Sequence, residues 1–468
     1  MFQLNASISV MAGGRTPADG KRLGEQMSKK ISGCLTLLAF LGLSIFLVNC
    51  GSSSSRPAGV LYVLSQGENK VGSYAIDLNN GKLSLINANA TTCTASAGCG
   101  FPESIILDPT AANAFVLNQG IFDTGITHVP PVAPSGVVPS IYGYTVKSDG
   151  NLTTTGDLTT NPGPPSSQAC NQPPQGVFTA CDLAVALARD AAGKFLFVIT
   201  QGNQALHALD NTLQNLPPQL IVFGVQGTTL SVLSTRSLTR IPTGLTVIAN
   251  PNGGILLYTT NSDDLGSGTD NTVSEYSVDT TSGIATELAG SPYTTGSVPS
   301  AVVAVQTTPT GGAGGLFVYV TNSGSGSGGN SISHFQVCTV ANGSCTAQDV
   351  TDSTMMPVGS GTSVGLDPVA MTVDPTNQFL YVLNHTSSSV SAFRINPTTG
   401  ALSALNPSTV STGSGPVGIA MHSSGKFLFV SNNASSNVSA FNADTTSGAL
   451  SNAINVTSSA QPAGIVAK

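Results

Sequence analysis

Short runs of apolar residues, separated by polar segments, recur along most of the chain. Some runs are aromatic and aliphatic with almost no polar interruption, whereas others alternate between apolar and polar positions. A continuous short run is typical of a strand buried on both faces, and alternation is typical of a strand with one buried face. Gly, Pro, Asn and Asp gather between the runs, as they do at turns. The pattern predicts a chain of short antiparallel strands.

Two stretches show that these strands belong to a repeat. Residues 367–405 (DPVAMTVDPTNQFLYVLNHTSSSVSAFRINPTTGALSAL) and 415–453 (GPVGIAMHSSGKFLFVSNNASSNVSAFNADTTSGALSNA) share one order of parts. A strand opened by Pro comes first, then an aromatic–aliphatic strand, then an alternating strand, and last a strand that follows a Gly-containing turn. Four such strands in succession match the blade of a β-propeller.

The order of the repeats predicts how the ring closes. The first strand of the unit is opened by Pro102, Pro242, Pro299, Pro368, Pro416 and Pro462, and we expect Asp182 to take the place of proline once more. The second strand starts at Val60, Ala114, Phe195, Ile255, Leu316, Phe379 and Phe427. The series thus begins with a second strand and ends with a first strand. We predict an all-β, seven-bladed propeller of four-stranded antiparallel blades, whose C-terminal strand joins the N-terminal blade and so removes an open edge.

The N-terminal region has the layout of an export signal. Lys29 and Lys30 precede an uncharged run from Ile31 to Val48. The segment that ends in Asn49-Cys50 resembles a bacterial lipobox, and this resemblance implies lipidation at Cys50. The alternative is an uncleaved membrane anchor, because the apolar run is close to the length that spans a bilayer.

The predicted organisation follows from this signal. Residues 1–50 are expected to form an extension and a signal peptide, residues 51–58 a Ser-rich tether, and residues 59–468 the propeller. Either Met1 or Met27 could be the true start. We expect an exported protein held in the bacterial envelope by its lipidated N-terminus only, in the outer membrane because no Asp follows Cys50. Whether it faces the periplasm or the surface stays open.

Charge and cysteine usage narrow the classes of partner. Only 8% of the residues are charged and the net charge is −7, with no cluster of Lys and Arg, so nucleic-acid binding is not expected. Six of the eight cysteines fall in close pairs. In an exported chain these pairs predict loop disulfides, and zinc is the weaker alternative because none has CxxC spacing. The expected pairs are Cys93 with Cys99, Cys170 with Cys181, and Cys338 with Cys345.

Several of these motifs resemble a known family. The phrase DPTNQFLYV (374–382), the strand VSAFRI, the turn TTGALS and the terminal QPAGIVA are similar to the seven-bladed lactonase-like family, which includes propeller-type 6-phosphogluconolactonases and YVTN-repeat surface proteins. The resemblance extends over about residues 59 to 468 and implies the propeller fold. It also implies an activity: members that open lactones place His, Arg and Glu around the central channel, after the first-strand Pro or the second-strand Asn.

The candidate site residues lie on one face of the predicted propeller. Long insertions follow the second and fourth strands, and we call the face on which these strands end the top. The second strands end there in Ser65, Asn118, Thr200, Asn261, Asn322, Asn384 and Asn432. Asn commonly caps such turns; the alternative is contact with a ligand. The ligand-binding candidates are Asn118, Asn261, Asp263, Asn322, Asn384 and Asn432.

The chemistry for hydrolysis is sparse. Opening a lactone needs a base and donors for the oxyanion, and a sugar phosphate favours a guanidinium clamp. His385 is the candidate base and Arg240 the candidate cation, whereas the tripeptides at Pro242, Pro368 and Pro416 contain no Arg. Asp263, Asp264 and Asp270 could bind calcium, although a solvated acidic loop is the simpler interpretation; otherwise no cofactor is expected.

The sequence therefore favours a binding or scaffold module of the envelope, whose partner is an envelope protein, a glycan or a small lactone. The alternative is a lactone hydrolase that acts at the top of the central channel, and self-association as a surface component is a third possibility. Binding predicts a plugged channel. Hydrolysis predicts that His385 lies within hydrogen-bond reach of Asp263 or Arg240.

Overall fold

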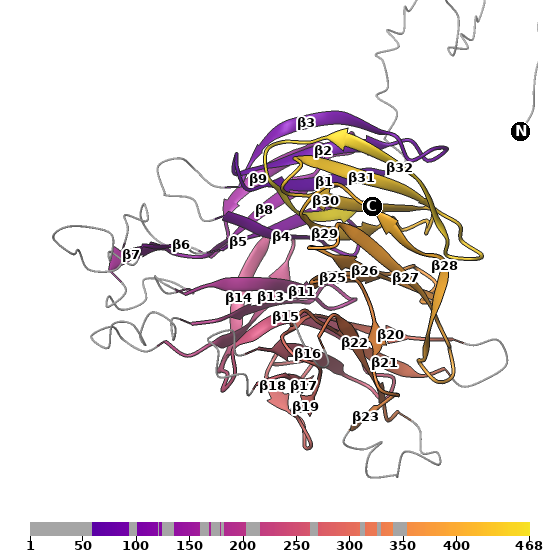
Figure 1. Cartoon of the computed structure of the whole chain (residues 1–468). Helices are drawn as coiled ribbons and strands as arrows, with labels where there is room; N and C mark the ends of the chain where they lie inside the picture. The colour runs from indigo at the N-terminus through magenta and orange to yellow at the C-terminus, as the bar shows by residue number, and fades with distance from the viewer. Residues whose placement is uncertain are drawn as a thin grey trace, which may run out of the picture. The chain divides into compact units, whose positions relative to one another are not determined.

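The strands form seven antiparallel sheets arranged as blades (Figure 1). The computed structural model describes residues 59–92, 101–119, 121–123, 135–159, 168–169, 178, 182–202, 216–262, 270–308, 314–324, 329–339 and 353–468. The chain divides into the units Met1–Ser55 and Arg56–Lys468, and the blades belong to the second. Within the described ranges, no helix has the length and apolar character needed to cross a bilayer.

The strands of each blade follow one another from the inside of the ring outward. Blade 1 contains β33 (Pro462–Ala467), β1 (Val60–Ser65), β2 (Lys70–Ile76) and β3 (Leu83–Thr91). Blade 2 contains β4 (Phe101–Leu107), β5 (Asn113–Gln119), β8 (Ser140–Val146) and β9 (Leu152–Asp157). Blade 3 contains β11 (Ala184–Arg189), β12 (Phe195–Thr200), β13 (Gln219–Gln226) and β14 (Thr229–Ser237).

The other four blades have the same order. Blade 4 contains β15 (Pro242–Ala249), β16 (Ile255–Asn261), β17 (Thr272–Val278), β18 (Ala285–Glu287) and β19 (Tyr293–Thr294). Blade 5 contains β20 (Pro299–Gln306), β21 (Leu316–Asn322), β22 (Ser331–Val337), β23 (Met355–Pro357) and β24 (Thr362–Ser363). Blade 6 contains β25 (Pro368–Val373), β26 (Phe379–Asn384), β27 (Ser389–Ile395) and β28 (Leu402–Ser411), and blade 7 contains β29 (Pro416–Met421), β30 (Phe427–Asn432), β31 (Asn437–Ala443) and β32 (Leu450–Thr457).

A small additional sheet interrupts this regularity. It joins β6 (Ile121–Asp123), β7 (Ser135–Val137) and β10 (Gln168–Ala169) in the order β10-β7-β6. β6 and β7 follow β5 of blade 2 and project away from the blades (Figure 1). The sequence pattern does not predict this sheet.

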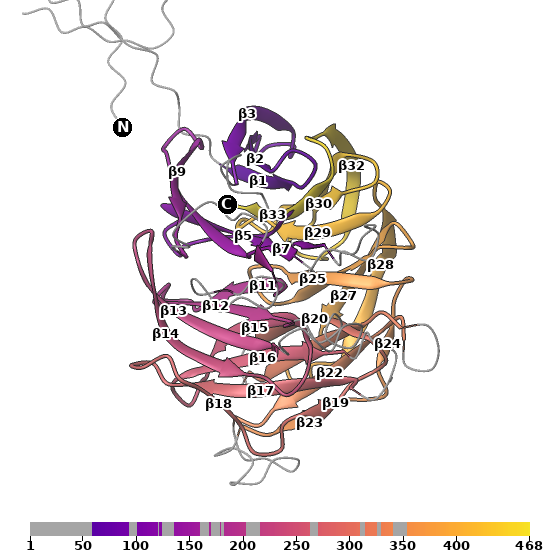
Figure 2. The ribbon, with the colours of Figure 1, turned by 90° about the vertical axis from the view of Figure 1, so that its left-hand side faces the viewer.

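The predicted closure of the ring is confirmed. β33 pairs antiparallel with β1, and Leu61 lies opposite Ala467 while Ser65 lies opposite Pro462 (Figure 2). The seven inner strands contact each other in a closed series: β33, β4, β11, β15, β20, β25, β29 and β33 again. Both ends of the propeller therefore belong to one sheet, which leaves no unpaired blade edge at the join.

The pairing corrects one detail of the repeat. We expected Asp182 to stand where the other inner strands have proline. In blade 3, however, Ala184 lies opposite Thr200, as Pro242 lies opposite Asn261 in blade 4. Asp182 precedes that position by two residues, and its carboxylate accepts the backbone N–H of Leu183 and Gly202, at 2.9 Å each.

Every inner strand begins with a β-bulge, in which one residue interrupts the pairing with the second strand. The bulge follows the opening Pro or Ala, and its residue is Ala463, Glu103, Val185, Thr243, Ser300, Val369 or Val417 in blades 1 to 7. A bulge bends the strand and redirects a side chain. The top end of the inner ring therefore presents one such residue from each blade.

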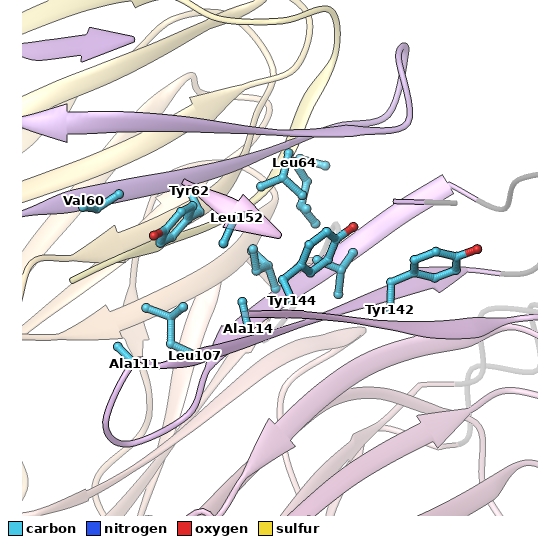
Figure 3. Packing of buried hydrophobic residues seen from close by; sticks show 13 residues of the cluster. Val60, Tyr62, Leu64, Leu107, Ala111, Ala114, Tyr142, Tyr144 and Leu152 are labelled. Carbon is cyan, nitrogen blue, oxygen red and sulfur yellow. The ribbon is translucent and has the colours of Figure 1, made fainter. Parts of the chain in front are cut away.

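The cores lie between neighbouring blades. Between blades 1 and 2, Val60, Tyr62 and Leu64 pack with Leu107, Ala114 and Leu152, and all are buried (Figure 3). The uninterrupted apolar runs form the second strands, and β26 and β30 are buried at every position. Because these strands lie between two neighbouring sheets, they have no solvent-facing side.

Bottom ends of neighbouring blades are held by a repeated contact. The hydroxyl of a second-strand Tyr donates to the carbonyl of a turn Gly in the next blade. The pairs are Tyr62 with Gly150 at 3.1 Å, Tyr319 with Gly400 at 2.8 Å, and Tyr381 with Gly448 at 2.8 Å. The ring of each Tyr is buried, so its hydroxyl needs a partner inside the protein.

Candidate functional site

The polar residues that end the second strands are buried at the top of each blade. Asn118, Asn322, Asn384 and Asn432 have at most 1% of their surface exposed. The side-chain nitrogens of Asn384 and Asn432 donate within their own blade: Asn384 to Ser389 and Ser391, at 3.1 and 2.9 Å, and Asn432 to Asn437 and Ser439, at 2.7 and 2.9 Å. Asn261 donates to Thr272 and Ser274 in the same way. Asn118 donates to Ser140 of its own blade at 3.1 Å and also to the Thr92 carbonyl, after β3 of blade 1, at 2.8 Å.

These contacts favour turn capping over ligand binding. A buried Asn whose side-chain nitrogen donates to the adjacent strand joins the second strand to the third, so it acts inside the blade. Contact of these Asn residues with a ligand stays a prediction. Asp263, the remaining member of the predicted binding set, lies outside the described residues.

A different set of side chains connects neighbouring blades at the top. Gln201, Thr243, Ser300, His385 and Asn433 each contact the backbone carbonyl of the proline that opens the next inner strand. The carbonyls are those of Pro242, Pro299, Pro368, Pro416 and Pro462, at distances from 2.6 to 3.3 Å. Between blades 1 and 2, Gln66 donates instead to the Glu103 carboxylate at 3.1 Å. We call these seven residues (Gln66, Glu103, Gln201, Thr243, Ser300, His385 and Asn433) the top rim.

Glu103 is the carboxylate of the top rim. It is the bulge residue of β4 and is partly exposed, with Gln66 as its hydrogen-bond partner. Burial raises the pKa of its carboxyl above the ordinary value. The inner strand of blade 1 fixes its backbone closely, since a Cβ on Gly464 would lie 2.6 Å from the Glu103 carbonyl oxygen. We did not select Glu103 from the sequence, although it directly follows a first-strand proline.

His385 lies at the seam between blades 6 and 7. Its Nδ1 is 2.9 Å from the Pro416 carbonyl oxygen, which can only accept a hydrogen bond. In the neutral imidazole the hydrogen therefore sits on Nδ1, and Nε2 keeps its lone pair. This geometry suits a base, because a bond at one ring nitrogen orients the other.

Arg240 lies in blade 4 and is engaged there. Its guanidinium is 3.6 Å from Asp270 and 3.5 Å from Glu287. The other described cations near the top are also paired: Lys70 with Glu68 at 3.3 Å and Arg236 with Glu287 at 3.7 Å. His385 and Arg240 thus have separate partners in different blades. In the described part of the chain, no contact joins the two predicted catalytic residues.

Most of the predicted metal, lipid and disulfide residues lie outside the described residues. These are Asp263 and Asp264, Cys50, and Cys93, Cys99, Cys170, Cys181 and Cys345. Asp270 contacts Arg240 and accepts the Thr272 hydroxyl at 2.9 Å, and the described residues contain no group of three or more possible metal ligands. Calcium binding stays a prediction. Cys338 is fully buried and disulfide-bonded, but its pairing with Cys345 also stays a prediction.

Two hollows lie at the bottom ends of the blades. One, of about 430 Å³, is lined by Asn250, Ile255, Asp279 and Ile284 of blade 4. The other, of about 440 Å³, lies between blades 5 and 6 and is lined by Gln306, Pro375, Gln378 and Arg394, among others. Asp279 accepts backbone N–H groups of its own turn, and Arg394 donates to the Thr446 carbonyl at 3.0 Å. The top rim is the better candidate for a functional site, because the Glu103 carboxylate and Nε2 of His385 can each still accept a hydrogen bond there.

Comparisons with known proteins place the fold. Residues 330–466 match the family model described as lactonase, seven-bladed β-propeller. The periplasmic gluconolactonase of Pseudomonas aeruginosa is 16% identical, with a TM-score of 0.59 over 87% of this chain and 98% of its own. The chain thus has the seven-bladed propeller fold, and its residues 330–466 resemble the lactonase family. A Bacteroides fragilis protein provisionally named a 6-phosphogluconolactonase is 13% identical, with a TM-score of 0.57 over 89% of this chain and 99% of its own. No curated protein sequence matches the chain.

Two of the three residue types that the resemblance to this family implies are found at the positions of interest. Glu103 follows a first-strand proline, and His385 follows a second-strand asparagine. The bulge positions after the other inner-strand openings carry Val, Thr, Ser or Ala. Arginine, the third type, is therefore missing from all seven bulge positions.

Proposed function

We propose that this lactonase-like propeller is a binding module of the cell envelope, and that its top rim holds an uncharged, hydroxyl-rich ligand such as a glycan or a sugar lactone. The observation that carries the proposal is the chemistry of the rim. Amide, hydroxyl and imidazole groups surround one carboxylate, while Lys70, Arg236 and Arg240 are each paired with an acid.

This composition suits neutral polyols better than phosphorylated sugars. A phosphate group is held by cationic donors, preferably a free guanidinium. A hydroxyl-rich ligand instead needs donors and acceptors in fixed places, and a carboxylate that accepts two hydroxyls is a strong anchor. We expect Glu103 to be that anchor, because it is the rim group with the greatest acceptor capacity.

The proposal is tested by titrating the purified protein with glucose, glucono-1,5-lactone and 6-phosphogluconolactone, using calorimetry and ligand-observed NMR. We expect weak binding of the neutral compounds and at least tenfold weaker binding of the phosphorylated one. Glu103→Gln should reduce neutral-ligand affinity tenfold or more. Glu68→Gln is the matched control, since Glu68 is exposed and, among the described residues, pairs with Lys70. Equal affinities of the two variants would refute the assignment of Glu103.

Hydrolysis of an uncharged lactone is the second candidate, and the orientation of His385 favours it. Nε2 would accept a proton from water while the oxygen of that water attacks the lactone carbonyl; the ring C–O bond then breaks and the released alkoxide takes up a proton. We expect His385→Ala to lower turnover at least a hundredfold, as measured by acid release at constant pH. If the parent protein does not hydrolyse the lactone faster than the uncatalysed rate, hydrolysis is excluded and only the binding function remains.

Export and anchoring are proposed from the sequence. Cys50 would carry the lipid, and the pairs Cys93–Cys99, Cys170–Cys181 and Cys338–Cys345 would form disulfides in an oxidising compartment. Labelling with a fatty acid, compared between the parent protein and Cys50→Ser, tests the anchor. Peptide mapping without reduction tests the pairs. An unlabelled parent protein, or peptides that link different pairs, would contradict these assignments.

A further inference from the structure

One buried carboxyl of the propeller does not belong to the top rim. Glu275 lies on β17 of blade 4 and is 0% exposed. It stands directly opposite Tyr258 of β16, whose hydroxyl donates to it at 2.8 Å. Tyr293 of β19 lies beside this carboxyl, and its hydroxyl accepts the Met355 backbone N–H of blade 5 at 3.2 Å. The group therefore lies inside the seam between blades 4 and 5.

The partners of Glu275 differ from those of the other buried acids. Asp374 accepts the backbone N–H groups of Thr376, Gln378 and Phe379 at 2.7 to 2.9 Å, and such bonds stabilise a carboxylate. In the described residues, Glu275 accepts the Tyr258 hydroxyl but no backbone N–H group, and no Lys, Arg or His forms an ion pair with it. A carboxyl in this position is held more easily as the neutral acid.

The surroundings of Glu275 on the blade 5 side are apolar. Tyr258 packs with Val318, Val320, Phe335 and Met355. Glu275 is the one carboxyl at this register: the corresponding third-strand positions of blades 1, 2, 3, 5, 6 and 7 hold Ser73, Gly143, Val222, His334, Ala392 and Ala440. A negative charge at Glu275 would face hydrocarbon across the seam, and no cationic side chain of the described residues pairs with it.

Glu275 is linked to charged side chains of its own blade through the Ser291 hydroxyl. The Ser291 hydroxyl accepts the Glu275 backbone N–H at 3.0 Å and donates to Glu287, also at 3.0 Å. Glu287 in turn pairs with Arg236 and Arg240. The titratable groups that face the carboxyl are thus Tyr258 from β16 and Tyr293 from the segment after β18, while blade 5 presents apolar side chains.

We propose that Glu275 is a proton-binding site that controls the seam between blades 4 and 5, which stays closed while the carboxyl is protonated and loosens when it ionises. The device goes beyond ligand binding at the top rim and does not depend on it. It would make the segment from Ser291 to Val298, which carries Tyr293 and leads into β20 beside the top rim, responsive to alkaline pH.

The direction of the pH effect follows from the two states of the carboxyl. Burial raises the pKa of Glu275 to about 8 in the folded protein, from an ordinary value of 4.5. Between these values the folded state holds one proton more than the unfolded state. Stability from this group is therefore full below about pH 4.5, falls as the pH rises, and is lost above about pH 8. The unfolding constant rises up to about tenfold per pH unit in that window.

The test compares the parent protein with Glu275→Gln, which keeps the shape and an acceptor for Tyr258 but cannot ionise. Urea unfolding from pH 5 to 9.5 should show the ratio of the two unfolding constants (parent over variant) rising with pH and levelling above about pH 8.5. Glu287→Gln is the matched control from the same blade. Because it keeps Glu275, its unfolding constant relative to that of Glu275→Gln should rise with pH as the parent's does. A ratio that does not change with pH would overturn the proposal.

Two further readouts keep the test decisive if Glu275→Gln folds poorly. Tyr258→Phe removes a bond that favours the carboxylate, so it should move the alkaline transition to higher pH. Hydrogen exchange, corrected for intrinsic rates, should show β17 and β21 losing protection between pH 6.5 and 9 before β30 of blade 7 does. Uniform loss across the blades, or an alkaline transition that Tyr258→Phe does not move, would contradict a seam-specific device.

Discussion

The two ends of the same blades solve the same packing problem in different ways. At the bottom, three seams share one contact: a buried Tyr hydroxyl donates to the carbonyl of a turn Gly in the next blade. At the top, the carbonyls of successive prolines are met by Gln201, Thr243, Ser300, His385 and Asn433, a different residue at each seam.

The turns show the same contrast. At the bottom, Asp108, Asp190 and Asp374 each accept backbone N–H groups of the turn between the first and second strands. Equivalent chemistry at equivalent places indicates that the bottom serves stability. The variety of the top rim shows that many donors can satisfy a proline carbonyl there. That freedom is compatible with the ligand-binding role that we propose for Glu103 and His385.

The largest effect is expected where a bottom turn touches an aromatic ring. Gly448 has φ +75°, and a Cβ there would lie 2.3 Å from Phe379 Cδ1. Gly448→Ala should lower the free energy of unfolding by about 3 kcal/mol, from overpacking and left-handed strain together. Gly227→Ala, at φ +61° with open space around it, should cost only about 1 kcal/mol. If urea unfolding shows the same loss of unfolding free energy for both variants, the Phe379 ring does not contribute to the cost.

Asp374→Ala should be the next most costly change. It leaves the N–H groups of Thr376, Gln378 and Phe379 without their acceptor, and Asp374 itself is buried. We expect a loss of about 2 to 3 kcal/mol, measured by urea unfolding at pH 7. Ser300→Ala is the comparison at the top, where water can replace the lost bond to Pro368; its cost should stay below about 1 kcal/mol. A similar cost for both variants would abolish the distinction between the two ends of the blades.

Tyr381→Phe tests a single bottom seam. The ring stays in place, but the Gly448 carbonyl loses its 2.8 Å bond. A loss of about 1 kcal/mol is expected from thermal or urea unfolding, with a similar value for Tyr319→Phe. Because the two bonds lie in different seams, the double variant should lose the sum. A clearly smaller combined loss would mean that the seams do not act independently.

The smallest effect should have the opposite sign. Burial raises the folded-state pKa of Glu103, so its ionisation opposes folding as the pH rises. Glu103→Gln is therefore expected to raise the unfolding midpoint slightly at pH 8 and to leave it unchanged at pH 4, while weakening ligand binding. A variant that is destabilised at pH 8 would show that the carboxylate serves the ring rather than a ligand.

The blades were predictable because their causes are local. Prolines at the start of the first strands and the apolar runs of the second strands mark strand ends and burial directly, and the offset between Val60 and Pro462 predicts the join of β33 with β1. Asp182 was misplaced because the proline position of blade 3 holds Ala184, which no local signal distinguishes. The interrupted outer strands of blades 4 and 5 were also not evident.

The candidate site was harder to predict because its residues are neighbours only across seams. His385 was selected from the sequence, yet its contact with Pro416 depends on the packing of blade 7 against blade 6. Glu103 was missed, although the pair Pro102-Glu103 could have indicated it. The Asn residues were selected for their repetition, which reflects a bond made in every such blade.

The order of apolar and turn-forming residues was by itself enough to determine a closed, seven-bladed ring of antiparallel sheets, because burial and turn geometry act between residues close in sequence. Only the tertiary structure decided which polar groups form the hydrogen bonds that stabilise that ring. The contact of Glu103 with Gln66, the carbonyl that orients His385 and the apolar seam around Glu275 all arise where two blades meet. The partners in each seam are brought together by packing rather than by the pattern of either blade.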